Sequence, residues 1–289
     1  MHPYLTKVKH SSRVQKLYSI LLIALLVCVG CQWHLQSKDD DADIEEVAIE
    51  RFDRAELLFL TTGDFSALQQ MKTAYPIETR TLIEDVLGLG RVDEADINTR
   101  FLFFFQDSTL QSLMLDVEEQ YHDVSDLNTS FTEAFSRLTQ MIPSLSVPRI
   151  YTQIGSLDQS VVVGDSMVGI SLDKYLGKDH PVYLKYGYNE RQRSMMTRQY
   201  IVPDCLGFYL LSRYPMSEDQ SETTDSLALH NARRNYMGRI QWVVNQVTET
   251  PVFQREEVQL VEDYMKSHRD TNIEELLALP VFADYHAER

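Results

Sequence analysis

The chain has 289 residues, and its 43 acidic side chains outnumber its 27 Lys and Arg, which gives a formal net charge of −16 at pH 7. This balance excludes a general nucleic-acid-binding protein, because neutralising phosphates requires a basic surface. Hydrophobic residues make up 44% of the chain and charged residues 24%, which is typical of a globular protein rather than a disordered chain or a coiled coil. Three cysteines are too few for a disulfide framework in a chain of this length.

The N-terminal segment has the pattern of an export signal. A basic flank that ends at Lys16 precedes an apolar run over 17–30, which is too short to cross a bilayer comfortably as a mature helix. Gly30 and Cys31 at the end of this run resemble the lipobox of bacterial lipoproteins, in which the signal peptide is cut before a lipidated cysteine. We therefore predict a lipoprotein signal peptide over 1–30 and lipidation at Cys31. A plain secretory signal or an N-terminal anchor is the alternative.

Residues 31–43 are predicted to be a lipidated, flexible tether, because they are polar and follow neither a helical nor a strand period. Several acyl chains on Cys31 would hold the protein durably to a membrane, whereas a single chain binds marginally. No later stretch is apolar for long enough to span a bilayer. The expected contact with the membrane is therefore the N-terminal lipid, and residues 44–289 are expected to form the folded domain.

Most of this domain is predicted to be helical. Between residues 107 and 121, apolar side chains recur at the three- and four-residue spacing that places them on one face of a helix. A second stripe runs from Leu127 to Ile142, and Pro143 follows its end. Other helices are expected at 45–60, 64–74, 78–88, 93–105, 190–213, 225–248, 254–268 and 272–279.

The middle of the chain has the pattern of β-strands. Short runs rich in β-branched residues occupy 149–154, 159–163 and 167–172, and glycines separate them. The second and third runs flank a turn sequence over 164–166, which predicts a hairpin. The sequence therefore predicts an α+β domain that is mostly helical and contains a small three-stranded sheet.

A motif follows the third predicted strand. Residues 170–183 read Ile-Ser-Leu-Asp-Lys-Tyr-Leu-Gly-Lys-Asp-His-Pro-Val-Tyr, and they resemble the corresponding segment of the gliding-motility lipoprotein GldB family of Bacteroidota. Further family-like segments extend the resemblance over 44–289. The resemblance implies a structural role for the positions that carry the motif, which are Asp173, Tyr175, Gly177, Asp179 and Tyr183.

The chain departs from the family pattern in its C-terminal half. The stretch between Gly238 and the helix expected near Glu257 is shorter than the family usually shows. A substantial part of that half is therefore expected to be missing, and a function that resides in it is not expected of this chain.

The resemblance also implies a distant relation to zinc peptidases, in which one helix carries two histidines at i and i+4 so that both bind the same Zn²⁺. The corresponding segment here, 194–213, contains neither His nor Glu, and Tyr200 and Asp204 occupy an i, i+4 pair. None of the eight histidines lies four residues from another. The expectation is a degenerate zincin-like scaffold with no catalytic residue, no metal ion and no cofactor.

Two other residues have the chemistry of a nucleophile. Ser166 lies in a Gly-Asp-Ser sequence like that of some esterases, but a strand pattern rather than a helix follows it, which favours a hairpin turn. Cys205 could act with His180 or His230, but its apolar neighbours favour the role of a small buried hydrophobic residue.

Taken with the resemblance, these features predict an exported envelope protein that its lipid anchors to the outer membrane, on the periplasmic or the surface face. The expected role is a non-catalytic scaffold or adaptor that binds other envelope proteins and is linked to gliding motility or envelope machinery. A hydrolase, either zinc peptidase-like or an esterase using Ser166, is the alternative, and a lipoprotein that binds a small molecule is a third possibility.

Overall fold

A computed structural model of the chain describes residues 46–216, 226–248 and 250–279. Contacts divide the chain into two units, Met1–Ala42 and Asp43–Arg289, and the described residues belong to the second. The predicted signal peptide, Cys31 and the tether lie outside the described residues. Within the described part of the chain, no helix is both long and apolar enough to cross a bilayer.

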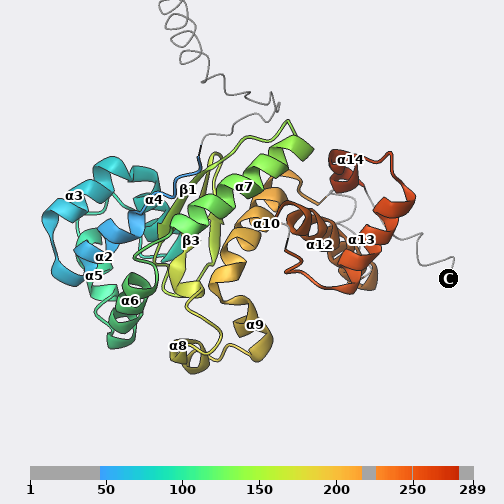
Figure 1. Cartoon of the computed structure of the whole chain (residues 1–289). Coiled ribbons are helices and arrows are strands. Elements are labelled where there is room, and N and C mark those ends of the chain that lie inside the picture. The colour runs from blue at the N-terminus through green and yellow to red at the C-terminus, as the bar shows by residue number, and fades with distance from the viewer. Residues whose placement is uncertain (1–45, 217–225, 249, 280–289) are drawn as a thin grey trace, which may run out of the picture. The chain divides into compact units, whose positions relative to one another are not determined.

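A small mixed sheet forms the middle of the domain, as the sequence predicts. It contains β1 (Arg149–Gln153), β2 (Val161–Val163) and β3 (Met167–Ser171) in the order β1-β3-β2. β3 runs parallel to β1 and antiparallel to β2, so the turn between β2 and β3 is a hairpin. Helices contact both edges of the sheet, with α2 (Phe52–Thr62) against β1 and α10 (Ile201–Arg213) against β2 (Figure 1).

Close packing between β1 and β3 requires a glycine. Gly169 lies opposite Tyr151 in the parallel register, and a Cβ at this position would overlap the Tyr151 ring and hydroxyl. The Tyr151 side chain is buried and also contacts Phe52 of α2 edge to face, with ring centroids 6.2 Å apart. The missing side chain at Gly169 therefore makes room for the aromatic residue that joins the sheet to α2.

The N-terminal half of the domain is helical, and α2 packs against β1. Asp64 and Asp107 cap two of its helices by accepting hydrogen bonds from backbone N–H groups in the first helical turn. The elements are α2 (Phe52–Thr62), α3 (Phe65–Ala74), α4 (Pro76–Arg80), the π-helix η1 (Thr81–Val86), α5 (Ile97–Phe104), α6 (Ser108–Gln120) and α7 (Ser125–Met141).

The helix predicted from residue 45 begins later, at Phe52. The preceding residues are extended: Val47 and Ile49 are buried, whereas Ala48 between them is exposed. Glu50 forms a parallel bridge to Tyr151, and its N–H donates to the carbonyl of Ile150 at 2.9 Å. The alternation of buried and exposed residues is that of a strand edge, and pairing with β1 outweighs the helical propensity of this segment.

The single helix predicted over 190–213 is also wrong. The chain forms α9 (Glu190–Met195), a 3-10 turn η3 (Arg198–Tyr200) and α10 (Ile201–Arg213). The interruption occurs where the backbone pairs with the loop after β3: Thr197 bridges Leu176, and the N–H of Gly177 donates to the carbonyl of Met196 at 3.0 Å. This long-range pairing takes the hydrogen-bonding groups that a continuous helix would need. Two short elements were not predicted, the 3-10 turn η2 (Leu172–Lys174) and α8 (Pro181–Lys185).

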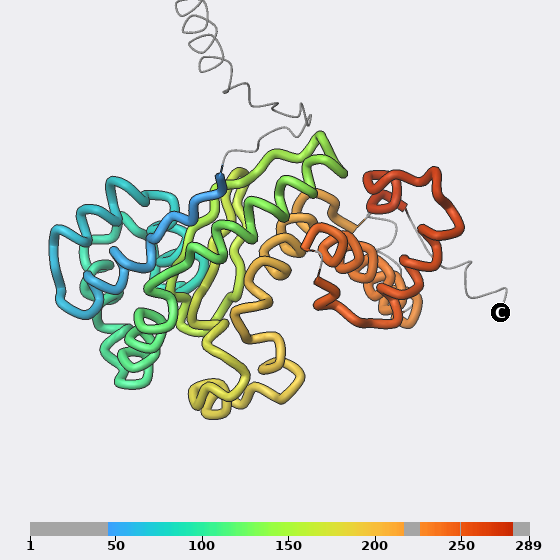
Figure 2. Tube along the Cα trace, in the orientation of Figure 1, coloured from blue at the N-terminus to red at the C-terminus, as the bar shows by residue number. Residues whose placement is uncertain are grey.

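The C-terminal helices are α12 (Ser226–Thr248), α13 (Glu256–Ser267) and α14 (Ile273–Ala278). α12 contacts α7, α10, α13 and α14, and the tube in Figure 2 shows it beside α10 and α13. A Cβ on Gly238 of α12 would lie 2.7 Å from the Cβ of Glu257, so glycine permits the close approach of α12 and α13. Arg239 is buried beside this contact and donates to the carbonyls of Leu276 and Leu279 at the end of α14.

Candidate functional site

The first residue of the family-like motif, Asp173, is fully buried and binds the backbone of a loop. Its carboxylate accepts hydrogen bonds from the N–H groups of Gly155 at 2.8 Å and Leu157 at 2.5 Å. Burial raises the pKa of Asp173, and these two N–H groups act in the opposite direction. Ser156 and Leu157 have φ angles of 49° and 67°, a left-handed conformation that these residues seldom adopt. Asp173 therefore supports a strained turn at the end of β1.

A second buried carboxyl group, Glu56 of α2, binds the same loop. Its Oε2 accepts a hydrogen bond of 2.9 Å from the N–H of Ile154. Burial raises the pKa of Glu56 well above its ordinary value, and the negative charges of Asp173 and Asp53 raise it further. Glu56 was not predicted as a site residue, because in the sequence it stands among the apolar positions of a helical face. The loop over 154–157 is thus held by one carboxyl from α2 and one from the motif.

Tyr175 links the motif to α10. Its hydroxyl donates to Oδ2 of Asp204 at 2.9 Å, and its own carbonyl accepts a hydrogen bond of 2.6 Å from the hydroxyl of Tyr121, the residue that follows α6. Burial raises the pKa of Asp204 to about 7, and the hydrogen bond from Tyr175 lowers it. The i, i+4 neighbour of Asp204, Tyr200, instead packs against the ring of Phe253 at 6.3 Å. The structure therefore pairs Asp204 with the motif and not with Tyr200.

Tyr183 closes the motif on itself. The hydroxyl of Tyr183 donates to the carbonyl of Asp173 at 2.8 Å and accepts from the N–H of Leu176 at 2.8 Å. One phenol thereby satisfies two backbone groups of a loop that would otherwise leave them buried and unpaired.

The remaining two motif residues lie where the loop reaches the surface. Gly177 has a φ of 110°, a conformation that favours glycine. Asp179 is exposed, and its carboxylate lies 4.0 Å from the guanidinium of Arg193. The five motif residues are therefore neighbours in space, but four of them contribute to folding the loop and only Asp179 faces solvent.

Ser166 and Cys205, the two residues with nucleophile chemistry, lie in different surroundings. Ser166 is exposed in the β2–β3 hairpin, and its carbonyl accepts from the N–H of Arg149 at 3.0 Å. Cys205 is buried, as predicted, and burial raises the pKa of its thiol well above the ordinary value. His180, a possible partner of Cys205, pairs with Asp116 at 3.1 Å. Among the described residues, no three His, Cys, Asp or Glu side chains are grouped so that they could hold a metal ion.

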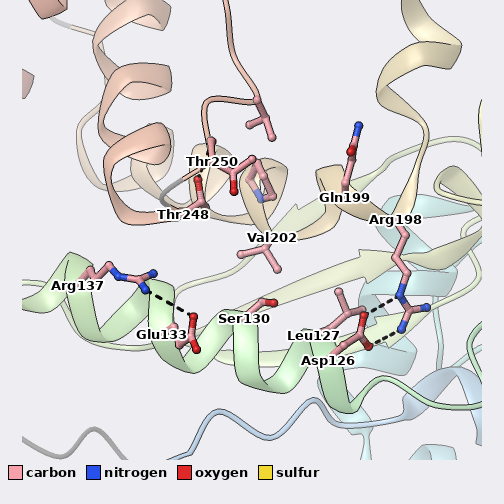
Figure 3. Close-up of a pocket in the computed structure, with 12 residues that line it drawn as sticks. Asp126, Leu127, Ser130, Glu133, Arg137, Arg198, Gln199, Val202, Thr248 and Thr250 are labelled. Carbon is pink, nitrogen blue, oxygen red and sulfur yellow. Dashed lines mark hydrogen bonds and ion pairs between the residues drawn. The ribbon is translucent and has the colours of Figure 1, made fainter.

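A hollow of about 460 Å³ lies on the surface between α7, the start of α10 and the chain that follows α12 (Figure 3). We call it the α7 trough. Its volume is within the range of ligand-binding pockets in proteins. α7 contributes Asp126, Leu127, Ser130, Glu133 and Arg137, and the opposite wall contains Arg198, Gln199, Val202, Pro203, Thr248, Thr250 and Val252.

Two ion pairs flank the trough. The guanidinium of Arg198 binds both carboxylate oxygens of Asp126, at 3.0 and 2.6 Å, and holds the pKa of that carboxyl below its ordinary value. Arg198 also stacks over the ring of Tyr121 at 4.9 Å. Towards the other end of α7, Arg137 lies 3.5 Å from Glu133. Figure 3 shows Ser130 between the two pairs.

The trough was not predicted from the sequence. Its α7 side chains recur at i, i+4, i+7 and i+11 from Asp126, which is a helical face distinct from the apolar stripe. This polar pattern can be read from the sequence, but solvated helices commonly have such a face, so it does not by itself indicate a site. The opposite wall comes from residues more than 60 positions away in the chain, and no local pattern indicates that they meet α7.

Comparison with protein families identifies a match. A family model described as gliding motility protein GldB matches residues 35–240. The match contains the motif, α7 and the start of α10, and it ends within α12, so it is shorter than the resemblance predicted over 44–289. No curated protein and no solved structure matches the chain.

Proposed function

This chain belongs to the GldB family of gliding motility proteins, and we propose that it is a non-catalytic scaffold that binds other envelope proteins. Family membership implies a gliding motility lipoprotein anchored in the cell envelope by lipid. The proposal adds that Cys31 carries the lipid, that residues 31–43 are the tether, and that the membrane is the outer membrane.

One observation carries the scaffold proposal. The motif by which the chain resembles its family uses its chemically active side chains for internal hydrogen bonds: Asp173 binds backbone N–H groups, Tyr175 binds Asp204, and Tyr183 binds backbone of the motif itself. A catalytic constellation instead directs such groups towards a space that a substrate can enter. We infer that the motif specifies the shape of the domain.

The proposal includes descent from a zincin-like scaffold. A short sheet precedes α10, which is the place of the zinc-binding helix in the peptidases that the family resembles, and α10 has neither His nor Glu. The helix also contains Pro203 in its first turn and Gly207 in its middle. The support for this descent is therefore the order of the sheet and α10 along the chain and the residue types that α10 contains.

The test separates a scaffold from a hydrolase. Cells that carry Cys31→Ser should release the protein from the membrane fraction and lose motility, and a foreign lipoprotein signal and cysteine should restore both. Purified domain without its tether should contain no stoichiometric zinc, cleave no peptide mixture and give no fluorophosphonate adduct on Ser166. Peptide or ester hydrolysis that is lost with Asp204→Asn or Ser166→Ala would overturn the scaffold role.

A further inference from the structure

The α7 trough offers two carboxylates at a fixed spacing. Asp126 and Glu133 are seven residues apart on α7, so they share one face and are separated by about 10 Å along the helix axis. Ser130 lies between them on the same face, and Val202 of α10 lies across the trough (Figure 3). The helix thus presents acid, hydroxyl and acid in a row.

The carboxylates face outwards, and the guanidinium groups that pair with them face inwards. The side chains of Asp126 and Glu133 are 60% and 58% exposed, whereas those of Arg198 and Arg137 are 28% and 29% exposed. Each guanidinium also donates to the protein backbone, Arg198 to the carbonyl of Asp123 at 3.0 Å and Arg137 to that of Val247 at 2.9 Å.

The hydrogen-bonding capacity that remains in the trough is therefore mostly that of an acceptor. A carboxylate has about four lone-pair sites and a hydroxyl has two, whereas the guanidinium N–H groups are largely engaged. The rest of the lining combines apolar side chains with three uncharged polar ones; these are Leu127, Val202, Pro203 and Val252, and Gln199, Thr248 and Thr250. Such a surface fits a ligand that combines cationic donors with aliphatic groups, as Lys and Arg side chains do.

We propose that the α7 trough binds an extended basic segment of a partner protein, with two Lys or Arg side chains three residues apart. A polyproline II segment has three residues per turn and rises about 3.1 Å per residue, so its side chains at i and i+3 point the same way at about 9 Å. That spacing matches the two carboxylates of α7. The inference rests on the proposed scaffold function and names the chemistry of its partner.

The charge of the whole chain supports this choice of partner. A net charge of −16 repels acidic segments and accelerates the encounter with basic ones. The polyproline II conformation is extended in the free segment, which lowers the entropy that is lost on binding.

The first experiment measures binding of a synthetic peptide, Pro-Lys-Pro-Pro-Lys-Pro with a fluorescent label, to the purified domain by anisotropy. The expected result is salt-sensitive binding that Glu133→Gln weakens about fivefold, because one charge-assisted contact is lost. Ser130→Trp should abolish binding by filling the middle of the trough. Glu118→Gln, which removes an equivalent exposed charge from α6, is the matched control and should bind as the wild type does.

A second peptide tests the spacing. Pro-Lys-Lys-Pro-Pro-Pro has the same composition and charge but places its lysines side by side, and it should bind at least about fivefold more weakly. Equal binding of the two peptides, or equal displacement of the probe by spermidine at matched charge, would show a non-specific cation surface and overturn the proposal. So would an affinity that neither trough variant changes, or no binding to the wild type.

A separate experiment, crosslinking in cells, tests the scaffold function. In cells, crosslinked complexes that persist in both Glu133→Gln and Ser130→Trp would retain the scaffold and reject the trough as its binding surface. Absence of any crosslinked complex in the wild type would reject the scaffold itself. Thermal unfolding of each variant verifies that the domain is intact, since both substitutions are at exposed positions of α7.

Discussion

Tyr175 and Asp204 share a hydrogen bond of 2.9 Å in the interior of the domain, and it joins the loop after β3 to α10. Asp204 is half-buried, and the causes that set the pKa of its carboxyl are burial and this one hydrogen bond. The backbone of Tyr175 is held in place as well, because its carbonyl accepts a hydrogen bond from the hydroxyl of Tyr121. The contact therefore connects the C-terminal end of α6, the motif and α10 through two phenols and one carboxyl.

This arrangement predicts a pH-dependent stability. The pKa of Asp204 is about 7 in the folded protein, against an ordinary value of 3.8. Between these values the folded state binds more protons than the unfolded state, so the free energy of unfolding falls as the pH rises from 3.8 to about 7 and then levels off. The slope is at most about 1.4 kcal/mol per pH unit. Asp204→Asn should flatten this part of the profile, as measured by urea unfolding at a series of pH values.

Tyr175→Phe provides the comparison for this profile. It removes the hydrogen bond that lowers the pKa of Asp204, so the loss of stability should continue to a higher pH than in the wild type. A profile of Asp204→Asn that parallels the wild type throughout would show that another group causes the pH dependence.

The sheet could be predicted because its strands are locally encoded. The runs at 149–154, 159–163 and 167–172 are rich in β-branched residues and lie between turn residues, and the strands begin and end within two residues of these bounds. The hairpin of β2 and β3 was predicted from its turn, but the parallel pairing of β3 with β1 was not, since it depends on Gly169 admitting the ring of Tyr151 from the neighbouring strand.

The elements that were predicted wrongly are those in which a distant segment competes for the backbone. The residues before Phe52 have helix-forming side chains but pair with β1, and those around Thr197 pair with Leu176 instead of continuing a helix. Glu56 was missed for the same reason: only the fold brings it to the N–H of Ile154. Local propensity contains no information about such partners.

The contact between Gly169 and Tyr151 gives a second prediction. Gly169→Ala should destabilise the domain by about 3 kcal/mol, because the added methyl group would overlap a buried ring between two strands. Tyr151→Leu in the same chain should restore part of this loss, and a double-mutant cycle in urea would measure the coupling. Additive effects of the two substitutions would contradict the direct contact. Gly187→Ala is unsuitable as a control because Gly187 has a φ of 76°, so Gly207→Ala, in an open position on α10, serves instead.

Cys205 gives a prediction about reactivity. Its thiol is buried and its pKa is raised by that burial, so it lacks both access and thiolate character at neutral pH. In the Cys31→Ser protein without its signal peptide, Cys205 is the one remaining cysteine. A thiol reagent such as iodoacetamide should label it slowly in the folded state and rapidly in urea. Rapid stoichiometric labelling of the folded protein would instead indicate an exposed and activated thiol.

Asp173 distinguishes a structural motif from an active one. Asp173→Ala leaves the buried N–H groups of Gly155 and Leu157 without an acceptor, which should cost about 2–4 kcal/mol of unfolding free energy. Asp173→Asn retains one acceptor oxygen and should cost about half as much. Tyr183→Phe is measured beside these two variants. If the motif only stabilises the fold, the loss of gliding in the three variants should be proportional to their loss of unfolding free energy in urea. A variant that keeps wild-type stability yet abolishes gliding would show that Asp173 takes part in the function directly.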